Sequence, residues 1–224
     1  MAEFYNPLPG IETYQENRNP IVCSPNCSYV LPFYQTKESL LDIDRYRTFL
    51  KNCESRFRHS MTYSNYKGFL IGLGLDRCQV HGFITSEMSG VDLEMHHTII
   101  TLFDICLIIT EHLLNTVGYV TTFDVVQLLK EEHKAHNVPL VMLSKTPHEI
   151  YHSNPSSFYI HPKMVFGNWG KLLEKYRFGL TQDISFKILY YLKRSFDENG
   201  TNDKDLLALR DKIKEWSNYN GDIS

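Results

Sequence analysis

The sequence predicts an α+β protein, and three observations support this prediction. Residues 66–98 contain short apolar runs separated by glycine, a pattern typical of strands. Residues 39–57 and 101–134 instead repeat apolar side chains every three or four positions, which indicates helices. Of the 224 residues, 42% are hydrophobic and 13% are aromatic, so we expect the chain to fold around a packed core.

The elements can be assigned in order from the N-terminus. Five prolines and scattered asparagines in residues 1–35 predict an extended, turn-rich arm. The next segment, residues 39–57, is predicted to be a helix with Thr36 or Ser39 as its N-terminal cap. Strands are then expected in three places, at residues 69–72, 78–85 and 91–95.

Two helices are expected within residues 101–134, at 101–114 and 122–134. Thr121 offers a hydroxyl cap to the second helix, and Asp124 places an acidic group in its first turn. The predicted buried stripes are Leu102, Ile105, Ile108 and Leu113 in the first helix and Phe123, Val126 and Leu129 in the second.

The chain returns to strand character at residues 138–143. Thr146 and Pro147 then open a short helix, because proline suits the first helical turn. This helix should end by Asn154, since the residue before Pro155 disfavours helical backbone angles. Three more helices are expected, at residues 169–176, 184–196 and 203–216.

These elements divide the chain into three regions. The expected arm covers residues 1–35, and a mixed core follows at 36–160 with residues 101–134 as a helical insertion. A helical region completes the chain at residues 161–224. The sequence contains no internal repeat, so a repeat architecture is not expected.

Composition limits the partners and the compartment. The net charge of −3 gives no overall attraction to nucleic acid, so any site for a polyanion must be local. The five cysteines are an odd number and the N-terminus lacks a secretion pattern, from which we expect a reducing, cytoplasmic setting without disulfides. The apolar stretch 99–109 is interrupted by Thr101 and Asp104 and is too short to span a bilayer, so we expect no membrane partner.

Two pairs of histidines mark the middle of the chain. His96 and His97 are adjacent at the end of an expected strand, so their side chains should point to opposite sides. His148 and His152 are four residues apart, and one turn of helix would place both imidazoles on one face, where they could hold a metal ion.

The order strand, Glu-x-His-His, strand, short helix with His-x-x-x-His resembles the HNH, or ββα-metal, endonucleases, which are also called His-Me finger nucleases. The resemblance rests on residues 91–97 and 138–152. It implies a ββα-metal core, cleavage of phosphodiester bonds in nucleic acid with DNA as the expected substrate, and one divalent ion, Zn²⁺ or Mg²⁺/Mn²⁺. Small stand-alone members are frequent in phages, so the resemblance also implies a phage origin and action in the host cytoplasm.

The resemblance also implies a role for each motif residue. His96, His148 and His152 would bind the metal ion, and His97 would be the general base that activates water. Glu94 would be a carboxylate that orients one of the imidazoles.

The chain departs from the family pattern in three places. Pro139 stands where the family usually has asparagine, so Asn137 is the candidate to turn its amide toward His97. The long gap between His97 and Asn137 requires the helical insertion. In place of the family's Cys-x-x-Cys pairs, a second, structural zinc site would have to be built from Cys23, Cys27, Cys78 and His81, for which buried thiols are the alternative interpretation.

Two other functions compete with the nuclease. The segment His148-Glu149-x-x-His152 also matches the zincin metallopeptidases, in which Glu149 would be the base and His161 or Glu174 the third ligand. In a third interpretation the metal unit only braces the fold, and the chain is a non-catalytic module that binds nucleic acid or protein.

Overall fold

The computed structural model describes residues 34–153, 159–198, 200 and 202–217. The chain divides into two units, Met1–Gln35 and Thr36–Ser224, and the described helices all belong to the second. The protein is α+β, as the sequence predicts, because helices and short two-stranded sheets share the chain. The first 33 residues of the expected arm lie outside the described residues.

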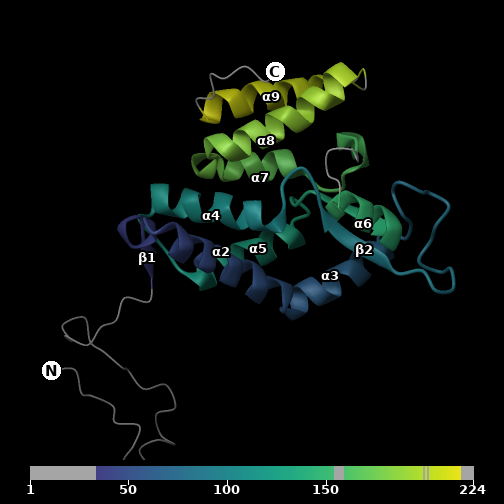
Figure 1. Cartoon of the computed structure of the whole chain (residues 1–224), viewed down its shortest axis with the longest axis horizontal. Helices are drawn as coiled ribbons and strands as arrows, with labels where there is room; N and C mark the ends of the chain where they lie inside the picture. The colour runs from purple at the N-terminus through teal and green to yellow at the C-terminus, as the bar shows by residue number, and fades with distance from the viewer. Residues whose placement is uncertain (1–33, 154–158, 199, 201, 218–224) are drawn as a thin grey trace, which may run out of the picture. The chain divides into compact units, whose positions relative to one another are not determined.

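Helices account for most of the described part of the chain (Figure 1). The α-helices are α2 (Ile43–Arg58), α3 (Met61–Gly72), α4 (Leu102–Thr116), α5 (Thr122–Lys134), α6 (Lys145–Ser153), α7 (Trp169–Lys175), α8 (Gln182–Lys193) and α9 (Lys204–Ser217). The strands are β1 (Gln35–Thr36), β2 (Leu93–His97), β3 (Tyr119–Val120) and β4 (Leu140–Ser144). Shorter helical turns are η1 (Glu38–Leu40), η2 (Pro162–Met164), η3 (Arg177–Gly179) and the π-turn η4 (Arg194–Glu198). None of the helices in this described part is long and apolar enough to cross a membrane.

The antiparallel pair β2 and β4 carries the first histidine motif. Successive side chains of a strand point to opposite faces, so Glu94 and His96 share one face of β2 while His97 lies on the other. The helix α6 begins at Lys145, directly after the last residue of β4, and it packs against both strands. The strand, strand, helix order that the motifs predicted is therefore present.

Both helices of the predicted insertion are present, as α4 and α5. Each begins with a reciprocal pair of hydrogen bonds, in which a threonine hydroxyl accepts from a backbone amide and an aspartate accepts from the threonine amide. The pairs are Thr101 with Asp104 and Thr121 with Asp124. The two helices pack against each other and against α2, so they form the centre of the helical core.

The predicted buried stripes are correct for most positions and wrong for one. Leu102, Ile105, Ile108 and Leu129 are fully buried, whereas Leu113 and Val126 are only half-buried. Phe123 is 74% exposed, and Val125 is buried in its place. The prediction failed because both residues are apolar and only two positions apart, so the periodicity alone did not decide which one faces α2.

The strand predicted at residues 69–72 is wrong, because these residues end helix α3. The hydroxyl of Ser60 caps this helix by accepting from the amide of Tyr63. Tyr66 and Leu70, four positions apart, are both buried, which is a helical period. A short apolar run next to glycine fits either element, and the cap at Ser60 decides in favour of the helix.

The strand predicted at residues 78–85 is also wrong. This segment is a loop that closes on itself, since the amide of Cys78 donates to the carbonyl of Ile84 over 2.8 Å. Gln79 attaches the loop to β4: its backbone amide donates to the Met142 carbonyl, and its side-chain oxygen accepts from the Met142 amide at 2.7 Å.

The helix predicted at residues 39–57 begins later than expected. Thr36 bonds to Ser39 of the turn η1, and Asp42 is the cap of α2, because its carboxylate accepts from the amides of Asp44 and Arg45. An aspartate cap also complements the positive end of the helix dipole, which explains why it starts the longer helix.

The C-terminal helices are held close to α4 by a single glycine. A Cβ atom at Gly179 would lie 1.8 Å from the carbonyl oxygen of Ile108, so no other residue allows η3 to approach α4 this closely. The following helix, α8, packs on α9 and brings Lys187 to Asp104 at the start of α4.

Candidate metal centre

Three imidazoles meet where β2 passes α6. His96 comes from the strand, and His148 and His152 come from the helix; one nitrogen atom of each lies within 4.8 Å of the others. The ring of His96 is 5.1 Å from the ring of His148 and 5.0 Å from that of His152, measured between centroids. We refer to these three residues as the histidine cluster. They are the three residues that the sequence selected as metal ligands.

The local fold explains why the three rings converge. The four-residue spacing places His148 and His152 one above the other on α6, with 4.5 Å between ring centroids. The helix follows β4 without a linker, and β4 pairs with β2 in a fixed register that sets His96 opposite Val141. The pairing of β2 with β4 and the direct connection of β4 to α6 therefore keep His96 close to His148 and His152.

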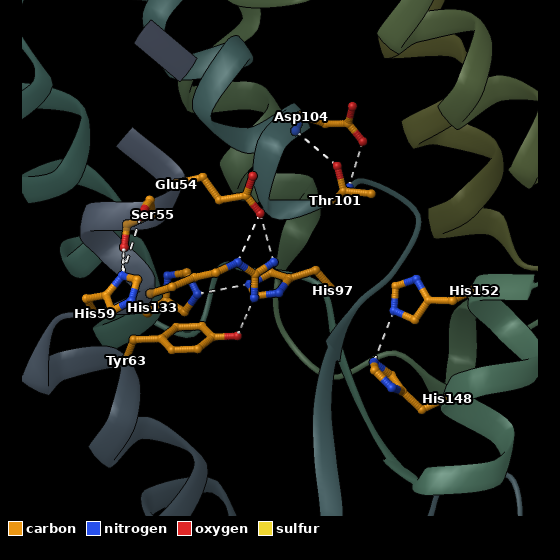
Figure 2. Close-up of polar contacts among 11 residues, drawn as sticks. Glu54, Ser55, His59, Tyr63, His97, Thr101, Asp104, His133, His148 and His152 are labelled. Atoms are coloured by element: carbon orange, nitrogen blue, oxygen red, sulfur yellow. Dashed lines mark hydrogen bonds and ion pairs between the residues drawn. The ribbon is translucent and has the colours of Figure 1, made fainter. Parts of the chain in front are cut away.

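Glu94 fixes the orientation of one imidazole. Nδ1 of His148 donates to the Glu94 carboxylate, so in the neutral ring Nε2 keeps its lone pair. That Nε2 atom lies 3.1 Å from Nε2 of His152. Figure 2 marks this contact with a dashed line between the two rings. A carboxylate that holds the far nitrogen of an imidazole is the usual arrangement around histidine ligands of metal ions.

His96 supplies a second sign that the cluster fits a cation. Its side chain is only 6% exposed, and its Nε2 atom has no hydrogen-bond partner among the described residues. Burial, assisted by the nearby imidazoles of His148 and His152, lowers the pKa of His96 to about 3. The ring is therefore neutral at pH 7, which is the form that binds metal ions.

The separations in the cluster suit a small, late transition ion. Nitrogens bound to one tetrahedral zinc ion at about 2.0 to 2.1 Å lie roughly 3.4 Å apart. The observed range, from 3.1 Å between His148 and His152 to at most 4.8 Å, includes this value. An all-imidazole ligand set favours Zn²⁺ or a similar ion over Mg²⁺, which prefers oxygen ligands.

His97 lies on the opposite face of β2, away from the cluster. Its Nε2 atom is 3.2 Å from Nε2 of His133 on α5, and its ring stacks on Tyr63 of α3 (Figure 2). Burial lowers the pKa of His97 well below its ordinary value, so this imidazole is also neutral. Strand alternation sends the two adjacent histidines in opposite directions, and Nε2 of His97 is engaged by His133, although His97 lines the same cavity as His96 and His152. The role of His97 as the general base therefore stays a prediction.

The bond between His97 and His133 has one consistent assignment of protons. Nδ1 of His133 lies 2.7 Å from the carbonyl oxygen of Leu129, which can only accept, so Nδ1 carries the proton. Nε2 of His133 is then the acceptor, and His97 donates. This pair ties β2 to the helical core.

Asn137 does not turn toward His97. Its amide donates to the carboxylate of Glu132 at 2.7 Å, and the same buried carboxylate accepts from Lys175 and Tyr176. Asn137 therefore satisfies a buried charge at the end of α5. Pro139, directly before β4, occupies the position at which the ββα-metal endonucleases usually have asparagine, so no asparagine side chain is present there.

His133 is a residue whose importance the sequence analysis missed. His133 is fully buried on α5, and the motifs assigned no role to it. The signal was available, since His133 follows the buried Leu129 by four positions and continues the stripe of α5.

Beyond His148 and His152, the cluster does not contain the base or the third ligand that a zincin would need. The side chain of Glu149 is 64% exposed, and it pairs with Lys145 at 3.8 Å. His161 accepts from the Lys163 amide, and Glu174 pairs with Lys212. The third member of the cluster, His96, comes from β2 and precedes the helix in the chain. The zincin interpretation requires a third ligand that follows the helix.

The suggested second zinc site is only partly within the described residues. Cys23 and Cys27 lie outside them, while Cys78 is fully buried and its sulfur accepts from the amide of His81 at 3.4 Å. For Cys78 the structure shows the buried thiol that was the alternative interpretation.

A cavity of about 320 Å³ adjoins the cluster. We call it the loop cavity, because the whole connection from β2 to α4, residues 98–101, lines it. Among its polar groups, the hydroxyls of Thr98 and Tyr151 lie 3.3 Å apart. The lining residues are His96, His97, Thr98, Ile99, Ile100, Thr101, Tyr151, His152 and Lys187.

Comparison with protein families gives one match, and it covers nearly the whole chain. Residues 11–219 match the family described as Bacteriophage G278-like virion protein. No curated protein and no solved structure matched the chain. The match includes the histidine cluster, the loop cavity and the C-terminal helices. The chain therefore belongs to the Bacteriophage G278-like virion protein family.

Proposed function

We propose that this phage virion protein is a metal-dependent endonuclease that hydrolyses phosphodiester bonds, with DNA as its substrate and His96, His148 and His152 as the ligands of one divalent ion. The convergence of these three side chains beside a cavity carries the proposal. A divalent ion bound there would polarise a phosphate oxygen and make water acidic enough to supply the nucleophile near neutral pH.

The protein residues have separate tasks in this proposal. Glu94 keeps the proton of His148 on Nδ1, so Nε2 faces the cluster. The buried environment of His96 keeps its ring neutral and ready to bind. His97 does not act as the base in this account; it holds β2 against α5 through His133.

The substrate class follows from the charge and the geometry around the cluster. The loop cavity contains one cationic side chain, Lys187, which suits an anionic substrate. Glu149, the residue that a peptidase would need as its base, pairs with Lys145 at the exposed side of α6. These two observations favour a phosphodiester over a peptide bond.

A plasmid-nicking assay tests this proposal. Protein freed of metal by EDTA should not nick supercoiled DNA, and added Zn²⁺ or Mn²⁺ should restore nicking. His148→Ala should abolish nicking, whereas Glu149→Gln, a change one residue away, should leave the rate unchanged. Nicking that survives in His148→Ala would reject the proposal, and loss of nicking in Glu149→Gln would give Glu149 a catalytic role that the proposal does not assign to it.

A second candidate function follows from the position of His97. Without an imidazole base on the cluster side of β2, the same ion could brace the β2, β4 and α6 unit in a virion protein that only binds nucleic acid or protein. In that case metal removal would lower the melting temperature, and no metal ion would produce nicking.

A further inference from the structure

The loop cavity lies beside the histidine cluster. Its wall consists of the last two residues of β2, the connection that follows them, two residues of α6 and Lys187 of α8. His96 and His152 belong both to this wall and to the cluster, so a ligand in the cavity would lie next to the candidate metal site. The volume of about 320 Å³ is at the lower end of ordinary small-ligand sites.

Lys187 supplies a positioned positive charge. Its ammonium group bonds to the carboxylate of Asp104, which is largely buried and also accepts from the amide of Thr101 at 2.7 Å. Asp104 thus fixes Lys187 to the start of α4. An ammonium group has three donors, and the bond to Asp104 uses one of them, which leaves two for a ligand in the cavity.

The cavity also contains uncharged polar groups. The Thr98 and Tyr151 hydroxyls lie together on its wall. Nε2 of His96 belongs to the proposed metal site and is not among the groups that would contact a ligand in the cavity.

The wall of the cavity is strained at one residue. Ile99 has a φ angle of +68°, which is an outlier for a β-branched side chain, and it is buried. Ile99 belongs to the connection that lines the cavity. Such strain persists only where the surrounding structure imposes it, and it is concentrated at binding sites.

We infer that the loop cavity is a binding site for a backbone phosphate of nucleic acid and that Lys187 contacts this phosphate. The inference rests on the proposed function for the choice of nucleic acid as the ligand. It adds a residue of α8 to a site otherwise built from β2 and α6. It also explains why Asp104 both caps α4 and holds Lys187 at the edge of the cavity.

The test measures DNA binding by the full chain in EDTA, without any cleavage. Fluorescence anisotropy of a labelled 16-base-pair duplex gives the association constant at several KCl concentrations. Removal of one phosphate contact should reduce the slope of log K against log salt by about 0.9. We expect Lys187→Gln to show this reduction and to bind roughly 3- to 10-fold more weakly at low salt.

Two variants serve as controls for Lys187→Gln. Lys214→Gln removes the same charge from an exposed position on α9 that does not line the cavity, and it should bind like the unaltered protein. Lys187→Arg keeps a cation that can still pair with Asp104, and it should restore most of the binding. Equal slopes and affinities for Lys187→Gln and the unaltered protein would overturn the inference.

The phosphate site and the nuclease activity can fail independently of each other. A protein that never nicks DNA but loses salt dependence in Lys187→Gln would retain the phosphate site and lose the proposed catalysis. Nicking with a KM that is unchanged in Lys187→Gln would retain catalysis and reject this site. A poly-glutamate peptide that binds with the same dependence on Lys187, while the duplex does not bind, would also reject it.

Discussion

Glu94 accepts a hydrogen bond from Nδ1 of His148, so the strand that supplies one candidate ligand also orients another on the facing helix. Glu94 and His96 can both face α6 because they are two positions apart on β2. The cluster therefore depends on the register between β2 and β4 as much as on the histidines themselves.

Glu94→Gln should weaken metal binding while leaving the fold intact. The amide can no longer balance the charge that develops on His148, and it can present a donor where the carboxylate only accepted. Loss of such a partner usually costs 10- to 100-fold in metal affinity. Competition against a chromophoric zinc chelator measures this affinity. Glu149→Gln is the matched control, and a loss of the same size in both variants would contradict the role assigned to Glu94.

His97→Ala should destabilise the protein, in contrast to the small effect expected of a solvent-facing base. The substitution leaves a cavity between α3 and α5 and removes the donor to His133, so we expect the free energy of unfolding to fall by roughly 2 to 4 kcal/mol. Zinc content should stay at that of the unaltered protein. Urea unfolding and metal analysis check both statements. Unchanged stability combined with loss of nicking would instead restore His97 as the base.

His133 should make the protein less stable as the pH falls below about 6.5. Burial lowers the pKa of His133 from 6.5 to about 4, so in this pH range the unfolded chain binds a proton that the folded chain does not. Its contribution to stability is complete above the unfolded pKa and decreases as the pH falls toward the folded pKa. The loss from this group amounts to about 3 kcal/mol at pH 4.

Urea unfolding in EDTA at pH 7 and pH 5 measures this dependence. His133→Gln keeps an acceptor for His97 but removes the titrating ring, so its stability should fall less between the two pH values than that of the unaltered protein. The same fall in both proteins would show that His133 is not the group responsible.

The sequence was sufficient to predict the parts of the fold in which spacing alone decides the geometry. The four-residue interval between His148 and His152 and the adjacency of His96 and His97 determine helix faces and strand sides in any structure. The order of the elements then brought the three expected ligands together. The cap predicted at Thr121 likewise fixed the start of α5.

Packing between distant elements determines the positions of several side chains that the sequence pattern did not predict. His97 could have faced solvent on its side of the strand, but α5 places His133 there, and nothing near residue 97 in the chain indicates that contact. Phe123 and Val125 are equally apolar, and only the packing of α5 on α2 selects Val125 for burial. Lys187 reaches the site from a helix ninety residues from β2, because Gly179 allows the C-terminal region to approach α4.

A calorimetric zinc titration tests whether the histidine cluster binds a metal ion. The full chain, prepared without a histidine tag and treated with EDTA, should bind one Zn²⁺ ion per chain. His96→Ala and His152→Ala, from the strand and from the helix, should each remove this binding, whereas Glu149→Gln should keep it. No heat of binding to the unaltered chain, or one ion still bound by both histidine variants, would contradict the account.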